Sequence, residues 1–180
     1  MTKEQETNWY AVQILSGQDY ITQEYCRSVI PKELLLEVFC PELKYHKKYQ
    51  GAWHEEKKLL FPGYLFIITK QVDDLKIALH QIPKLTKVLG TDHTPVALSE
   101  KEVSFLKHFL NTDYQVDISE GILVGDQLIV QSGPLKGMEG MVKRIDRHKR
   151  IAVIETDMFH RKIEMTVGLE VIEKKEAITL

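Results

Sequence analysis

The stretch from Val124 to Val142, VGDQLIVQSGPLKGMEGMV, decides how the second half of the chain folds. Apolar and polar residues alternate from Gln127 to Gln131, which predicts one strand of a small sheet. The tripeptide Ser132 to Pro134 ends that strand. Gly137 and Gly140 are expected where the backbone turns tightly or approaches another backbone, because a β-carbon would obstruct either arrangement. The stretch therefore predicts two strands joined by a glycine-rich turn.

The remainder of the second half is a series of short strand-like runs without a helical period. Five such runs predict a small β-barrel. The expected strands are residues 127–131, 141–145, 151–156, 161–167 and 170–173. Just before them, residues 111–121 are polar and acidic and show neither a helical nor a strand period, which predicts a linker.

The first half alternates strands and helices. Strands are expected at residues 9–15, 38–43, 64–69 and 86–89, and helices at 19–30 and 73–82. In the first helix, Ser16 is the candidate N-cap, and Ile21, Tyr25 and Val29 form an apolar face. Ser99 and Glu102 form a capping box at the start of a further helix. The fold class is therefore α+β, with a ferredoxin-like order that leaves one sheet face available.

Composition limits the protein to a few functional classes. No run of about 18 or more uncharged apolar residues occurs, and the N-terminus is charged, so neither a membrane span nor secretion is expected. Cys26 and Cys40 lack a CxxC spacing, which fits the cytosol and buried thiols. No hydrolase, nucleotide-binding or metalloprotease motif is present, and Cys40, His46 and His54 have no recognised ligand spacing. We therefore expect a protein that is not an enzyme and that binds neither a cofactor nor a metal ion.

Net charge is −2, but basic residues gather in two segments. Residues 136–150 hold six Lys and Arg residues against Glu139 and Asp146. Residues 44–58 hold five lysines interleaved with Tyr45, Tyr49 and Trp53, in what is expected to be a polar loop. Cations mixed with aromatics suit phosphate contact and base stacking. Each segment equally fits a solvated hairpin tip.

Four motifs in order resemble the NusG family of transcription elongation factors. They are WYAVQ with SGQ, FPGYLF, PVALSEKEV and the stretch quoted first, which looks like a KOW motif. The resemblance implies an NGN domain at residues 1–110, a linker at 111–121 and a KOW domain at 122–180, a five-stranded barrel.

By this resemblance the NGN domain binds the clamp helices of RNA polymerase, holds the clamp closed and raises processivity. The positions that match the polymerase-binding patch are Trp9, Tyr10, Phe61 and Tyr64. Aromatics are suitable anchors for such a contact, but ordinary core packing explains the same residues. Phe61 and Tyr64 are expected to contact the polymerase, and the choice between contact and core is left open for Trp9.

The KOW half departs from the usual pattern of housekeeping members. VKRIDRHKR at residues 142–150 replaces an acidic hairpin, which resembles LoaP-type antiterminators and favours nascent structured RNA as partner. Non-template DNA is a further candidate partner, and a monomer is expected. The expected RNA-binding residues are Lys136, Lys143, Arg144, Arg147, His148, Lys149, Arg150, His160, Arg161 and Lys162. The alternatives are a housekeeping factor whose KOW domain binds Rho or a ribosomal protein, and a ribosome-associated KOW protein.

Overall fold

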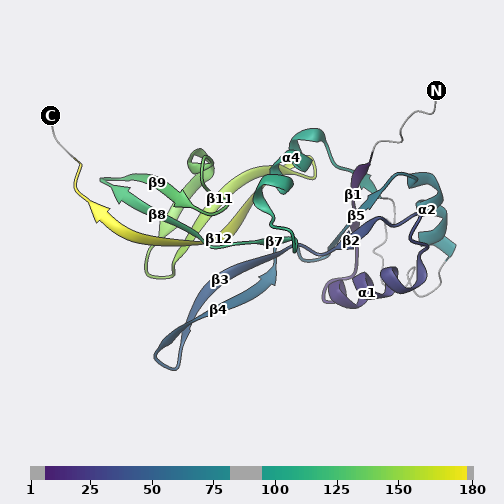
Figure 1. Cartoon of the computed structure of the whole chain (residues 1–180), viewed down its shortest axis with the longest axis horizontal. Helices are drawn as coiled ribbons and strands as arrows, with labels where there is room; N and C mark the ends of the chain where they lie inside the picture. Colours follow the sequence, from purple (N-terminus) through teal and green to yellow (C-terminus); the bar gives the residue numbers. More distant parts are fainter. Residues whose placement is uncertain (1–6, 82–94, 178–180) are drawn as a thin grey trace. The chain divides into compact units, whose positions relative to one another are not determined.

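The computed structural model describes residues 7–81 and 95–177. The chain divides into two compact units (Figure 1). The first unit comprises Met1–Pro41 and Phe61–Val103, and the second comprises Glu42–Leu60 and Ser104–Leu180. No helix in the described ranges is long and apolar enough to cross a membrane.

The first unit contains a four-stranded antiparallel sheet in the order β2-β5-β1-β6. Its strands are β1 (Asn8–Gln13), β2 (Glu37–Phe39), β5 (Tyr64–Thr69) and β6 (Val96–Ala97). Leu65, Phe66 and Ile67 of β5 are fully buried, as is Val12 of β1. Burial of this run explains its β-branched and aromatic composition. The strand expected at residues 86–89 lies outside the described residues, and β6 supplies the fourth strand.

The α-helices within the described ranges are α1 (Asp19–Val29), α2 (Val72–Gln81) and α4 (Glu100–Phe109). All three were expected, and the capping box is confirmed at α4: Ser99 N donates to Glu102 Oε2 at 2.7 Å, and Glu102 N donates to Ser99 Oγ at 3.3 Å. Together with the sheets they confirm an α+β fold.

The N-cap and the buried face predicted for α1 are wrong. Its N-cap residue is Gln18, without a side-chain cap, and Asp19 Oδ1 instead accepts a hydrogen bond from Gly63 N at 2.7 Å. Ile21 is 59% exposed, whereas Thr22 and Cys26 are fully buried. The helix therefore buries small residues under a sheet that it approaches at β2 and β5. Burial raises the pKa of the Cys26 thiol to about 12, and both cysteines are free and buried, as expected.

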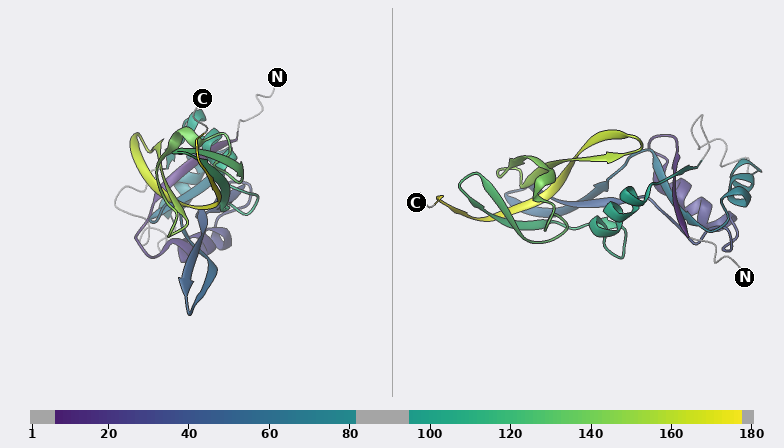
Figure 2. Two further views of the ribbon diagram at one scale, coloured as in Figure 1. Left: turned by 90° about the vertical axis from the view of Figure 1, so that its left-hand side faces the viewer. Right: turned by 90° about the horizontal axis from the view of Figure 1, so that it is seen from above.

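The second unit contains a five-stranded sheet in the order β10-β11-β12-β8-β9, curved around its own core (Figure 2). The strands are β8 (Ser119–Val124), β9 (Gln127–Ser132), β10 (Val142–Asp146), β11 (Ile151–Met158) and β12 (Arg161–Lys175). β12 pairs with β8 in parallel, and the other pairs are antiparallel.

Three predictions for this half are corrected. The runs at 161–167 and 170–173 are one continuous strand, β12. Segment 111–121 is not free of strands, because it holds β7 (Gln115–Val116) and the start of β8. No pairing joins β9 to β10 among the described residues, so the sheet has two edges and closure into the expected small barrel is not found.

Residues 42–59 form a long hairpin instead of the expected polar loop after residue 43. β3 (Glu42–Tyr49) pairs with β4 (Ala52–Leu59) over eight residues, and β7 adds a short parallel strand beside β3. Gln50 and Gly51 both have positive φ, at 51° and 79°. Two such residues in a two-residue loop match the twist of antiparallel strands, which fixes the register of the hairpin.

The glycines of the KOW-like turn differ in what they require. A β-carbon on Gly133 would lie 2.6 Å from Ser119 Cα, and the residue has a φ of +91°. Gly137 has a φ of +79° but open space around it. Gly140 has neither a positive φ nor a close neighbour, so the expected obstruction is wrong there.

An ion pair within the second unit gives its stability a pH dependence. Lys44 Nζ donates to Asp117 Oδ1 at 2.7 Å, and this hydrogen bond holds the pKa of Asp117 below its ordinary value of 3.8. A lowered pKa means that the ionised carboxylate stabilises the fold above pH 3.8 and loses this effect as the pH falls through the lowered pKa.

We expect Asp117→Asn to lower the free energy of unfolding at pH 7 by at most about 1 kcal/mol, because the pair is partly exposed and screened. Urea unfolding at pH 7 and pH 2.5 checks this. The difference between variant and wild type should shrink at the lower pH, and an equal difference at both would contradict the role of the charge.

Candidate nucleic-acid interface

The turn between β10 and β11 carries the densest group of expected RNA-binding residues. Residues 147–150 connect the two strands, and Asp146 Oδ1 accepts a hydrogen bond from Lys149 N at 3.0 Å. Arg150 has a φ of 52° and its carbonyl accepts from Leu169 N at 3.0 Å. The first bond closes the turn, and the second joins it to β12. Arg147, His148 and Lys149 are consequently displayed to solvent.

The cations of this region differ in how they are neutralised. Lys143 Nζ lies 3.3 Å and Lys162 Nζ 3.4 Å from Glu155 Oε1. The Lys143 hydrogen bond is the main cause of the lowered pKa of Glu155. Arg144 and Arg147 are exposed and have no ion pair within the described part of the chain. These two guanidinium groups are therefore available to an anionic ligand.

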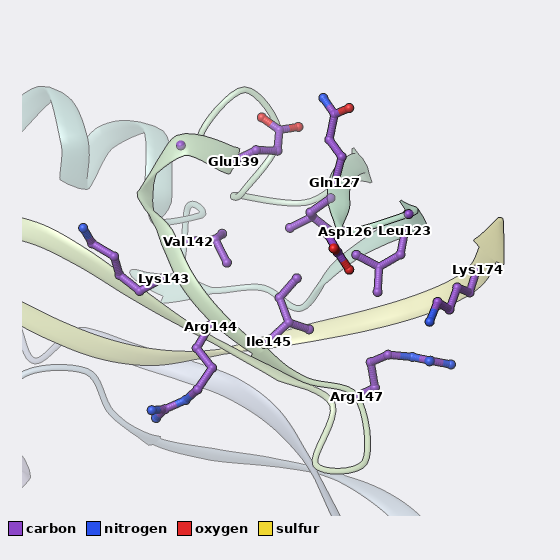
Figure 3. A pocket seen from close by; sticks show the side chains of 13 residues that line it. Leu123, Asp126, Gln127, Glu139, Val142, Lys143, Arg144, Ile145, Arg147 and Lys174 are labelled. Atoms are coloured by element: carbon purple, nitrogen blue, oxygen red, sulfur yellow. The ribbon is translucent and has the colours of Figure 1, made fainter. Parts of the chain in front are cut away.

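A groove of about 570 Å³ lies between the two edge strands, β9 and β10 (Figure 3). Leu123, Leu128, Val142 and Ile145 give it apolar walls. In Figure 3 Ile145 points toward Leu123 and Asp126, while Arg144 points the other way. Lys143, Arg147 and Lys174 also line the groove, against Asp126 and Glu139. Its lining is thus basic with an apolar interior.

The other expected RNA-binding residues are more dispersed. Lys136 is exposed in the loop after β9, where Lys136 N donates to Gly133 O at 3.1 Å. His160 and Arg161 lie at the β11–β12 turn, and His160 has a φ of 60°. Glu155 brings Lys162 beside Lys143. None of Lys136, His160 and Arg161 lines the groove between β9 and β10.

The four aromatics expected to bind RNA polymerase lie in the first unit and are mostly buried. Trp9, Tyr10 and Phe61 are 9%, 9% and 6% exposed. The Trp9 and Phe39 rings pack edge-on with their centres 5.6 Å apart, and the ring centres of Phe61 and Phe66 are 5.5 Å apart. Burial is the main cause of the raised pKa of Tyr10. Tyr64 is the half-buried member, so it has the most area left for a partner.

The hairpin β3–β4 adds basic and aromatic residues that were not among the expected site residues. A second groove of about 590 Å³ runs between this hairpin and the β10–β11 turn, with Lys47, Lys48, Trp53, His148 and Lys149 among its lining. The interleaved cations and aromatics were visible in the sequence. What the sequence interpretation missed was the hairpin itself, because its loop residues Gln50 and Gly51 are not the Asn-Gly or Asp-Gly pair that signals a two-residue turn.

Among the described residues, no group of three or more His, Cys, Asp and Glu side chains could hold a metal ion. His46 and His54 lie on paired strands, whereas Cys40 precedes the hairpin. The Nδ1 atom of His46 is 3.7 Å from Glu170 Oε2.

Comparison with known proteins places the chain among transcription factors. Residues 7–107 match the family described as transcription termination factor NusG. Over 174 residues the chain is 28% identical to the transcription termination/antitermination protein NusG of Staphylococcus epidermidis, covering 92% of this chain and 94% of that protein. The same protein of Rickettsia felis is 24% identical over 173 residues, covering 93% and 90%.

A solved structure of domain interaction in Thermotoga maritima NusG is also similar. Its TM-score is 0.52 at 21% identity, and the match covers 92% of this chain and 94% of that one. At this identity the likeness concerns the fold alone.

Proposed function

Because this chain belongs to the NusG family of transcription termination/antitermination factors, we propose that it is a specialised, LoaP-type member that nascent RNA recruits. In this proposal residues 1–110 act as an NGN domain that binds the clamp helices of RNA polymerase. Residues 122–180 act as a KOW domain that binds structured RNA. The chain promotes elongation through pauses and terminators without chemistry of its own.

One observation carries the RNA assignment: Arg144 on β10 and Arg147 in the turn that follows are both exposed and have no ion pair within the described residues. A guanidinium group presents a planar fork of donors that matches phosphate oxygens and guanine edges. Lys143, His148 and Lys149 extend this row of basic residues along the sequence, although Lys143 is paired with Glu155 and Lys149 lies 3.9 Å from Asp146. Such a row can track a phosphate backbone, whereas an acidic or neutral hairpin could not.

The polymerase assignment rests on the aromatic residues beside the Pro62–Gly63 turn. Tyr64 retains exposed area, and it directly follows Gly63, whose φ of +82° sharply turns the chain. Phe61, Tyr10 and Trp9 are buried in the same unit, where Phe61 packs against Phe66 and Trp9 against Phe39. Binding across a cleft shifts the clamp toward its closed state by the difference in affinity for the two states. RNA held by the second half raises the local concentration of the first half at the polymerase.

A housekeeping role is the second candidate, and the groove between β9 and β10 favours it. Its apolar walls, between two unpaired strand edges, suit a segment of a protein such as Rho or a ribosomal protein. The curated relatives carry the general termination/antitermination description.

Gel filtration of the full chain with four separate partners distinguishes the two candidates. The partners are RNA polymerase core enzyme, a structured leader RNA from the same genome, Rho and the ribosomal protein. We expect co-elution with polymerase and with the RNA. Co-elution with Rho or the ribosomal protein but not with RNA would replace the specialised role by the housekeeping one, and failure to co-elute with polymerase would overturn both.

A further inference from the structure

The second groove lies between two segments that are far apart in the sequence. One wall is the hairpin β3–β4, with Tyr45, Lys47, Lys48, Trp53 and Lys58, and the other is the β10–β11 turn, with His148 and Lys149. Both walls belong to the second compact unit. The groove therefore continues the basic surface of the β10–β11 turn onto a hairpin from the first half of the sequence.

The charge of this groove is of one sign. Lys47, Lys48, Lys58 and Lys149 line it, and no Asp or Glu is among its described lining residues. Lys149 Nζ lies 3.9 Å from Asp146 Oδ2. For the other three, no ion pair is found within the described ranges 7–81 and 95–177. A concave surface with several unneutralised lysines attracts a polyanion.

Aromatic rings alternate with these lysines. Lys58 Nζ lies 5.0 Å from the centre of the Tyr45 ring, and Lys48 Nζ lies 5.9 Å from that of Trp53. Cations beside aromatic rings suit a single-stranded nucleic acid, because the cations can pair with its phosphates and the rings can stack against its bases. In a duplex the bases are stacked on one another, so their faces are not available to these rings.

The hairpin wall is held in place by a bridge from the sheet. Arg150 Nη1 lies 3.1 Å from Glu170 Oε1, and the other oxygen of Glu170 is 3.7 Å from His46 Nδ1. The Arg150 guanidinium also lies 4.3 Å from the centre of the Trp53 ring. Gly168 lets the backbones approach, since a β-carbon there would be 2.9 Å from Lys44 O. Arg150 therefore positions the groove and is not free to contact phosphate.

We propose that this groove binds a single-stranded segment of the RNA whose structured part lies on the β10–β11 turn. The inference rests on the proposed RNA binding of the second half and adds a second, chemically distinct contact to it. Phosphates pair with Lys47, Lys48 and Lys149, and a base stacks against the exposed part of Trp53. An acidic peptide would satisfy the lysines but has no flat group for the rings, which is why RNA is favoured.

The test uses the full chain and two RNAs: a leader hairpin with a single-stranded tail, and the same hairpin without it. We expect the double substitution Lys47→Ala, Lys48→Ala to weaken binding of the tailed RNA about tenfold. The slope of log affinity against log salt should also fall by roughly one or more. Binding of the tailless hairpin should not change. Lys32→Ala with Lys70→Ala removes two exposed charges elsewhere and should change neither.

Tryptophan emission gives an independent measurement at the same site. The chain has two tryptophans, so the signal of Trp53 is the difference between wild type and Trp53→Phe. We expect the tailed RNA to quench this difference signal and the tailless hairpin to leave it unchanged. Circular dichroism establishes that each variant is folded.

The failures of the two proposals are distinguishable. If tailed RNA binds the Lys47, Lys48 variant as it binds wild type and leaves Trp53 emission unchanged, the groove is not an RNA site, although the proposed function stands. If wild type binds neither RNA, both proposals fall. Quenching of Trp53 by a poly-glutamate peptide but not by the tail would assign the groove to an acidic protein segment instead.

Discussion

Gly133→Ala should be the most destabilising small substitution in the second unit. The residue has a φ of +91°, which costs a side chain about 1–2 kcal/mol. Its new β-carbon would also lie 2.6 Å from Ser119 Cα and 2.7 Å from Ser119 Oγ. Ser119 cannot yield easily, because it is fully buried and its Oγ accepts a hydrogen bond from Leu135 N at 3.0 Å. Forced displacement of packed atoms adds about 1–3 kcal/mol.

Thermal unfolding of three alanine variants measures this directly. We expect a total loss of about 3 kcal/mol for Gly133→Ala, which lowers the Tm of a unit of this size by roughly 10 °C or more. Gly137→Ala, with a positive φ but open space, should lose about 1 kcal/mol. Gly140→Ala should lie within about 0.5 kcal/mol of wild type. Equal effects at Gly133 and Gly140 would show that the approach of β8 to the turn is not a constraint on folding.

The combined substitution Lys143→Ala, Arg144→Ala, Arg147→Ala should have the largest effect on RNA affinity. Each cation that contacts a phosphate releases counterions, so its removal weakens binding and reduces the slope of log affinity against log salt by about one. We expect a loss of roughly 30- to 100-fold at low salt and a slope smaller by two to three.

The side chains of Lys143 and Arg144 are exposed and that of Arg147 lies in the turn, so the fold should tolerate the change. Fluorescence anisotropy of a labelled leader RNA at two salt concentrations gives both quantities. A matched control removes three exposed lysines elsewhere, Lys32, Lys70 and Lys107, and should retain nearly wild-type affinity. If both variants lose affinity equally, only net charge matters and no defined RNA site exists.

Periodicity predicted most of the elements but not their pairing. α2 and α4 were predictable because Pro83 and a capping box mark their ends, and the runs of β1 and β5 are strongly apolar. The apolar face chosen for α1 was wrong, since Thr22 and Cys26 are small enough to let the helix approach the sheet and Ile21 is not. β8 was missed because Gly121 and the polar residues before it hide a strand that pairs at both edges.

The basic residues of the candidate site were readable from composition, but their grouping was not. Sequence alone could not tell that Lys143 and Lys162 share an ion pair with Glu155, or that Arg150 pairs with Glu170. It also could not place residues 44–58 beside residues 148 and 149, because that proximity depends on β12 contacting β3. Long-range packing decides which of many surface cations share one ligand.

Single-round transcription through a terminator, with RNA polymerase from the same organism, tests the proposed function most directly. The template carries the leader RNA sequence upstream of the terminator or lacks it. We predict that the wild-type chain raises read-through only when the leader is present, and that the Lys143, Arg144, Arg147 variant loses this gain. Equal read-through on both templates, by both proteins, would contradict RNA-dependent recruitment and leave a general elongation factor.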